Sequence, residues 1–218
     1  MGINAVARDS PAGHPDQHGA NIGPICIPAV KRGYVRQAIA IEPGPDNARL
    51  LRANVALNGL HDRIIVHECA AGATAGTVQL ELSATNYGDH RVKVSDEDGA
   101  MAEKEREIVT VISCPLDTLC PEAIGANVML WIDTQGFEGF VLAGATRILA
   151  NHPPAVVELW PYGLARSGAF PALLIALKGY SGFYDLADPT EFIPMAKLEC
   201  HASKYGTDYS AFTDILAL

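Results

Sequence analysis

Short apolar runs recur along this chain with helical segments between them, and this alternation restricts the possible folds more than any other feature. The runs are rich in β-branched residues and cover residues 38–41, 64–68, 108–112, 128–132 and 155–159. Residues 128–132 are apolar throughout, which is typical of a strand buried on both faces. Residues 45–58 and 140–150 carry apolar side chains at helical spacing. This order predicts an α/β fold with a doubly wound, mostly parallel sheet and helices on both faces.

The N-terminal stretch lacks this pattern. Residues 1–17 are rich in Gly, Pro and Asp and show no sustained periodicity, so we expect a mobile tail there. The remaining residues, 18–218, have the length of one α/β domain with a single core.

The composition argues against several classes of partner. The formal net charge of −9 disfavours a nucleic-acid ligand, because phosphates would be repelled. The sequence contains no apolar run long enough to span a membrane, and its start lacks the order of a signal peptide, so we expect a cytoplasmic protein. The five cysteines form no CxxC pair and the histidines are scattered, which predicts no metal site.

A glycine loop and an acidic residue together indicate a nucleoside ligand. Gly19 and Gly23, with Asn21 between them, let the backbone approach a ligand closely ahead of a short helix. Glu42 follows Gly23 by nineteen residues and ends the first apolar run. An acid at this place can accept hydrogen bonds from both ribose hydroxyls. These features do not choose between NAD and S-adenosylmethionine (SAM).

Two further acids follow buried runs, where ligands of such sheets bind. Asp133 comes directly after residues 128–132, and Glu158 lies near the end of residues 155–159. A charge at the end of an apolar strand requires a partner or a ligand. Asp133 is the first candidate for a polar anchor or catalytic base, although it can also cap the turn after its strand. Glu158 is the second candidate.

Several segments carry a more specific pattern. They are Gly19 to Gly23 (GANIG), residues 40–45 (AIEPGP), 54–59 (NVALNG), 69–72 (CAAG), 116–119 (LDTL), 132–138 (IDTQGFE), 141–145 (VLAGA) and 154–160. In order and spacing these segments resemble the FkbM-type methyltransferase family over residues 18–160. The segment around Asp133 is the most specific of them.

The resemblance implies a class I, Rossmann-like methyltransferase fold with SAM as the methyl donor. It also implies an acceptor hydroxyl on a small molecule such as a sugar or a polyketide. By position, the cofactor-binding residues would be Gly19, Asn21, Gly23, Glu42, Pro43, Cys69, Ala70 and Asp133. Glu42 would hold the ribose, and Asp133 would face the reactive centre. The acceptor pocket would be built from variable loops such as residues 83–91.

One departure from the family pattern concerns the first central strand. The family carries an apolar strand that ends in an acid two residues before the first glycine, whereas this chain has Gln17 there. Residues 12–16 cannot form a buried strand, so this strand is missing or degenerate, or residues 3–7 supply it from further back. Two alternative functions therefore stay open. One is a catalytically impaired methyltransferase-like protein that acts in binding or assembly. The other is an NAD-dependent oxidoreductase, disfavoured because the glycine loop lacks the full GxGxxG spacing.

Overall fold

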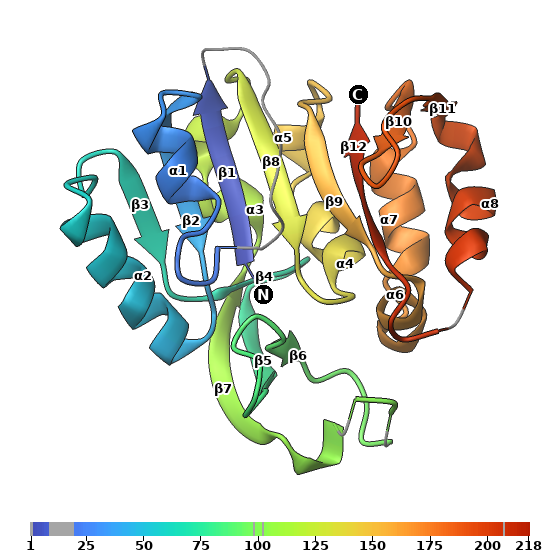
Figure 1. Cartoon of the computed structure of the whole chain (residues 1–218), viewed down its shortest axis with the longest axis horizontal. Helices are drawn as coiled ribbons and strands as arrows, with labels where there is room; N and C mark the ends of the chain where they lie inside the picture. Colours follow the sequence, from blue (N-terminus) through green and yellow to red (C-terminus); the bar gives the residue numbers. More distant parts are fainter. Residues whose placement is uncertain (1, 9–19, 98, 102, 207) are drawn as a thin grey trace.

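The computed structural model describes residues 2–8, 20–97, 99–101, 103–206 and 208–218. The strands of the main sheet are β1 (Gly2–Arg8), β2 (Val35–Ile41), β3 (Ile64–His67), β8 (Val128–Asp133), β9 (Ala155–Leu159), β10 (Gly182–Asp185), β11 (Phe192–Pro194) and β12 (Thr213–Ala217). They lie side by side in the order β11-β10-β12-β9-β8-β1-β2-β3 (Figure 1).

The α/β fold is confirmed, but the main sheet is mixed. The pairs β2–β3 and β8–β9 are parallel. Strand β1 runs antiparallel to both β2 and β8, and β12 runs antiparallel to both β9 and β10. Strand β11 is antiparallel to β10. The prediction of a doubly wound, mostly parallel sheet is therefore not confirmed in that detail.

The prediction of a tail outside the sheet is wrong for Gly2–Arg8, which form the central strand β1. Its residues pair with β2 from Ile3–Ile41 to Arg8–Val35 and with β8 from Gly2–Asp133 to Ala7–Val128. Without β1, the facing edges of β2 and β8 would each present unpaired backbone N–H and C=O groups. Hydrogen bonding to β2 on one side and to β8 on the other stabilises the strand, although the sequence of this segment shows no strand periodicity. Residue 1 and residues 9–19 lie outside the described residues.

Helices cover both faces of the sheet because successive residues of a strand point in opposite directions. On β2, Ala38 and Ala40 pack with α1 (Cys26–Lys31) and α2 (Pro45–Leu57). Ile39 and Ile41 belong to the larger core on the other face. Helices α3 (Leu116–Leu119), α4 (Glu138–Ala143), α5 (Thr146–Leu149), α6 (Pro161–Ser167), α7 (Phe170–Leu177) and α8 (Leu198–Ala202) contribute residues to that core. Among the described residues, no helix combines the length and the apolar character needed to cross a membrane.

Two helices differ from the sequence prediction. The short helix expected after the glycine loop begins only at Cys26, after Pro24. The helix expected over residues 140–150 is divided into α4 and α5. The side chain of Asp117 accepts hydrogen bonds from the backbone N–H groups of Arg147 (2.8 Å) and Ile148 (3.0 Å), which satisfies a separate helix start.

The chain between β3 and β8 builds a second, smaller sheet. Its strands are β4 (Ala70–Ala71), β5 (Gly76–Leu82), β6 (Arg91–Val92) and β7 (Glu107–Cys114), in the order β4-β7-β5-β6. Figure 1 shows this sheet beyond the edge at which β1 begins, drawn below the main sheet. Leu80 and Val92 form a small core that also packs against Phe137, the residue before α4. The second sheet is thereby held next to the ends of β2 and β8.

Candidate functional site

The candidate residues gather where β2, β8 and β9 end. Gly2 of β1 pairs with Asp133, and Ile3 pairs with Ile41, so the start of β1 lies at this same edge. Since β1 separates β2 from β8, Glu42 and Asp133 are two strand spacings apart, about 10 Å. The edge therefore carries two neighbouring groups of polar side chains.

The first group consists of Asn21, Glu42 and Asn47, and we refer to it as the Glu42 group. Glu42 has no exposed surface, and its Oε1 accepts a hydrogen bond of 2.8 Å from the backbone N–H of Gly44. Burial raises the pKa of Glu42, although Gly44, Asn47 and the backbone of Asn21 oppose the increase. The Oε2 atom of Glu42 and the Oδ1 atoms of both asparagines are buried without a hydrogen-bond partner. Buried acceptors of this kind favour a ligand with hydroxyl or amino donors.

The loop of residues 83–91 covers the Glu42 group. The side-chain amide of Asn47 donates a hydrogen bond of 2.8 Å to the backbone carbonyl of Tyr87. The ring of His90 lies against Gly44, with its Cδ2 2.9 Å from the position that a Cβ of Gly44 would take. Desolvation lowers the pKa of His90 to about 4, and its Nδ1 accepts a hydrogen bond from the backbone N–H of Ser83. Glu42 has no exposed surface, so a ligand would reach it only after a movement of the residues that cover it.

The other predicted cofactor residues are placed in different ways. Gly23 has a φ of +101°, and a Cβ there would lie 2.4 Å from Ile27, so only glycine fits this turn. Pro43 is buried directly after Glu42. Gly19 lies outside the described residues.

Cys69 and Ala70 follow β3 and are buried. The side chain of Cys69 belongs to the larger core with Ile41 and Leu116, and desolvation raises the pKa of its thiol to about 11. The structure thus brings Asn21, Glu42 and Pro43 to one end of β2. Gly23 lies against Ile27 and Leu51, and the Cys69 side chain is a core residue.

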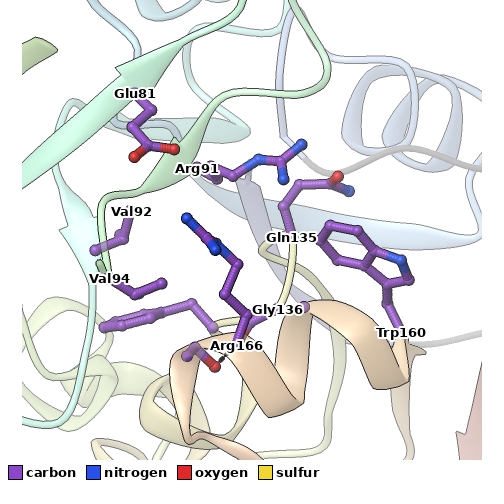
Figure 2. A pocket seen from close by; sticks show the side chains of 11 residues that line it. Glu81, Arg91, Val92, Val94, Gln135, Gly136, Trp160 and Arg166 are labelled. Carbon is purple, nitrogen blue, oxygen red and sulfur yellow. Dashed lines mark hydrogen bonds between the residues drawn. The ribbon is translucent and has the colours of Figure 1, made fainter. Parts of the chain in front are cut away.

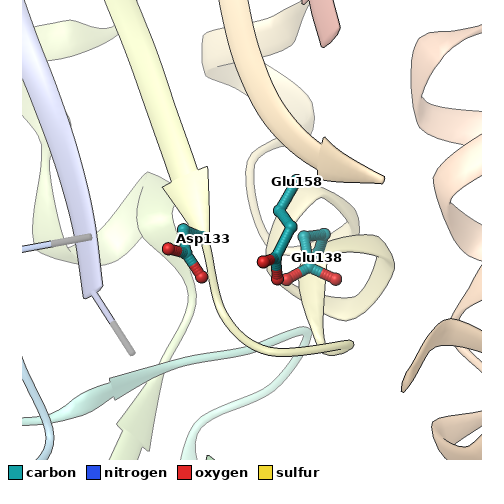
Figure 3. Close-up of side chains that lie close together, drawn as sticks. All are labelled: Asp133, Glu138 and Glu158. Atoms are coloured by element: carbon teal, nitrogen blue, oxygen red, sulfur yellow. The ribbon is translucent and has the colours of Figure 1, made fainter. Parts of the chain in front are cut away.

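The second group consists of Asp133, Glu138 and Glu158, which we call the carboxylate cluster (Figure 3). One carboxylate oxygen from each residue lies within 4.8 Å of the other two. Glu158 comes from β9 and Glu138 from the first turn of α4, and both are buried, while Asp133 at the end of β8 is half-buried. The cluster therefore joins the two predicted catalytic residues and adds a third acid.

The turn between β8 and α4 holds Glu138 in place. Its Oε1 accepts hydrogen bonds from the backbone N–H groups of Thr134 (2.8 Å) and Gly136 (3.1 Å), whereas its Oε2 has no partner. Gly136 has a φ of +91°, and a Cβ there would lie 2.5 Å from the backbone of Gly163. The turn thus requires glycine for both its conformation and its packing against α6.

Three acids this close together do not all ionise at neutral pH. Burial, together with the nearby charge of Asp133, raises the pKa of Glu138 to about 7 and that of Glu158 well above its usual range. The side chain of Gln135 donates to Asp133 at 2.7 Å and lies 3.3 Å from both carboxylate oxygens of Glu158. The cluster can therefore hold and exchange protons near neutral pH. The sequence predicted no metal site, and carboxylates at this spacing are also able to bind a cation.

An α/β sheet with acidic residues gathered at the ends of its parallel strands has the architecture of many α/β enzymes. The chain belongs to the FkbM methyltransferase family, because residues 17–177 match the methyltransferase FkbM domain. This match confirms the resemblance that the sequence motifs indicated. No protein with a curated description matches the chain.

One solved structure is similar, the crystal structure of methyltransferase FkbM from Methylobacillus flagellatus KT. It shares 16% sequence identity with this chain, and the TM-score is 0.48. The similar region covers 92% of this chain and 42% of the other, so the chain spans less than half the length of that protein.

Several residues of the site were missed by sequence reasoning. Gln135 and Glu138 lie inside the segment that carries the family resemblance, and the turn glycine between them was the available signal. Glu103 lies in a charge-rich stretch that reads as a solvated surface, yet it is only 3% exposed. Arg91 of β6 and Arg166 of α6 both approach Glu103, and no sequence pattern marked either arginine as a site residue.

Proposed function

We propose that this protein is a SAM-dependent methyltransferase that transfers a methyl group to a hydroxyl oxygen of a small molecule. Membership of the FkbM family supports the methyltransferase activity. The cofactor and the acceptor class are proposed from the residues at the ends of β2 and β8.

The observation that carries the proposal is the unpartnered Oε2 of Glu42. This oxygen is buried at the end of β2 beside Asn21, whose Oδ1 is also unpartnered. A ribose supplies two hydroxyl donors, which suits these acceptors. The residues present therefore fit the nucleoside part of SAM, with Glu42 accepting from the ribose and Asn21 and Gly23 lining the adjacent loop.

Asp133 and Gln135 are the candidates for handling the acceptor hydroxyl. Bound SAM supplies a methyl group on a sulfonium, which is a good leaving group. The carboxylate of Asp133 would accept the proton of the acceptor hydroxyl as the hydroxyl oxygen takes up the methyl group. Gln135 orients Asp133 through the 2.7 Å hydrogen bond. Alignment of the reacting atoms by such groups lowers the barrier without further chemistry from the protein.

A calorimetric titration with S-adenosylhomocysteine and, separately, with NAD tests the cofactor. We expect the first to bind and the second not to bind. At a hundred times its dissociation constant, S-adenosylhomocysteine should stabilise the fold by about 2.7 kcal/mol. A folded sample that binds neither compound would favour the non-catalytic alternative, and binding of NAD alone would favour the oxidoreductase.

A further inference from the structure

A pocket beside the carboxylate cluster is lined by residues that the proposed function has not used. It lies between the second sheet and α6, and its lining includes Glu81, Arg91, Gln135, Phe137, Trp160 and Arg166 (Figure 2). Gln135 is the residue that bridges Asp133 and Glu158, so the pocket adjoins the place where the acceptor hydroxyl must lie.

Two arginine side chains converge at this pocket from separate elements. Figure 2 shows Arg166 extending from α6 toward Arg91, which comes from β6. Nη1 of Arg91 and Nε of Arg166 both lie 3.6 Å from the same oxygen, Oε1 of Glu103, which is beyond hydrogen-bond distance. The two guanidinium groups therefore share one carboxylate oxygen, and neither forms a hydrogen bond with it.

Arg91 is fixed in place but has unused donors. Its side chain is only 6% exposed, its Nη2 pairs with Asp89, and its guanidinium carbon lies 5.2 Å from the ring centroid of Trp160. Its Nε and Nη1 are buried without a hydrogen-bond partner. Leaving buried charged donors unpaired is costly, so they favour an acceptor supplied from the pocket.

Three arginines and three acids lie around the pocket. Arg91, Arg106 and Arg166 face Asp89 and Glu103, and Asp89 is occupied by pairing with both Arg91 and Arg106. Glu81 also lines the pocket, but burial raises its pKa and favours its neutral form. With Glu81 protonated, one negative charge on a ligand would balance the three guanidinium groups.

We propose that the methyl acceptor is a hydroxy acid whose carboxylate binds Arg91 and Arg166 in this pocket. The inference rests on the proposed function, since it places the acceptor hydroxyl beside Gln135 and Asp133. The planar guanidinium groups match the geometry of a carboxylate. The methyl group passes from the sulfonium sulfur to the hydroxyl oxygen, the hydroxyl proton leaves to Asp133, and the carboxylate of the acceptor stays unchanged.

The test compares matched probes on the full chain. Binding of D-glucuronate, D-glucose and glucose 6-phosphate is measured by ligand-observed NMR or calorimetry, in the presence of S-adenosylhomocysteine. We expect glucuronate to bind at least tenfold more tightly than glucose and more tightly than the phosphate. Equal binding of glucuronate and glucose would overturn the proposal, and tighter binding of the phosphate would overturn the choice of a carboxylate.

Variants assign the binding to the pocket. Arg166→Gln should reduce glucuronate affinity at least tenfold, whereas Arg166→Lys should retain part of it because the charge remains. Arg36→Gln, at an exposed position of β2, is the matched control and should change nothing. Loss of the fold in Arg166→Gln would show in circular dichroism, and Arg166→Lys then decides the result. Unchanged glucuronate affinity in a folded Arg166 variant would overturn the proposal.

The failure of this proposal is separable from failure of the proposed function. S-adenosylhomocysteine binding without preference for glucuronate would leave the methyltransferase proposal standing and remove the hydroxy acid. Selective glucuronate binding that depends on Arg166, in a protein that does not bind S-adenosylhomocysteine, would support the pocket and contradict the methyltransferase.

Discussion

Gln135 donates a hydrogen bond of 2.7 Å to Asp133 from a backbone position with a φ of +55°. A non-glycine residue in this left-handed conformation is uncommon and strained. The conformation places the Gln135 amide 3.3 Å from both carboxylate oxygens of Glu158 as well. One donor thus connects two acids that are predicted to act on the acceptor.

Gln135→Glu should destabilise the protein by about 1–3 kcal/mol at pH 8, because it replaces the amide donor of this bridge with a further acid. The loss should shrink at pH 5.5, where the added carboxyl group is more readily protonated. Urea denaturation at the two pH values measures the change. Gln79→Glu, at an exposed position of β5, is the control. Equal stability of Gln135→Glu and wild type at pH 8 would contradict the bridging role.

The raised pKa of Glu138 makes stability depend on pH. Its pKa is about 7 in the folded protein, against 4.5 for the free side chain. A group with a raised pKa contributes its full stability below pH 4.5, and this contribution is lost as the pH rises through 7. Glu138→Gln keeps the acceptor oxygen but cannot ionise. Relative to wild type, the free energy of unfolding of this variant should therefore rise by up to about 3 kcal/mol between pH 4.5 and pH 7.5.

Denaturation curves at several pH values in this range measure the gain. Glu191→Gln, at an exposed position, controls for the loss of one negative charge. If the free energy of unfolding depends on pH in the same way in Glu138→Gln and Glu191→Gln, the pKa of Glu138 is not raised in the folded protein.

Glu42→Gln should affect ligand binding and stability in opposite directions. The affinity for S-adenosylhomocysteine should fall by about 1.5–3 kcal/mol, because glutamine offers a single acceptor oxygen to two ribose hydroxyls. The ligand-free variant should be at least as stable as wild type at pH 8, because burial raises the pKa of Glu42 and disfavours its ionised form. Calorimetric titration and thermal denaturation measure the two effects. An unchanged affinity would show that Glu42 does not contact the ligand.

Ala5→Pro tests whether β1 is a central strand. Ala5 pairs with Ile39 of β2 and with Leu130 of β8. Proline removes a backbone N–H and clashes in the middle of a sheet, which should cost about 3 kcal/mol or more. The melting temperature should then fall by roughly 6 °C or more for a chain of this size. Ala5→Gly keeps the N–H group and should cost only about 1 kcal/mol. Equal melting temperatures for the two variants would remove β1 from the centre of the sheet.

Much of the architecture could be predicted from local sequence patterns. The apolar run at residues 128–132 lies in β8, and the residues with helical spacing after Pro45 form α2. Glu42 and Asp133 both lie at strand ends, as expected from their places after apolar runs. These predictions were correct because side-chain periodicity and the apolar character of a buried strand depend on residues that are close together in the sequence. The segment around Asp133 that carries the family resemblance likewise consists of consecutive residues.

The tertiary structure alone decided how distant segments meet. Gly2–Arg8 form the central strand because two facing strand edges pair with them, and nothing in the seven residues specifies an antiparallel direction. Arg91 and Arg166 share one oxygen of Glu103 because β6 and α6 both pack against the turn between β8 and α4. The raised pKa values of Glu138 and Glu158 arise from burial and mutual approach of three acids. Contacts of this kind depend on packing between elements, which the sequence of each element does not encode.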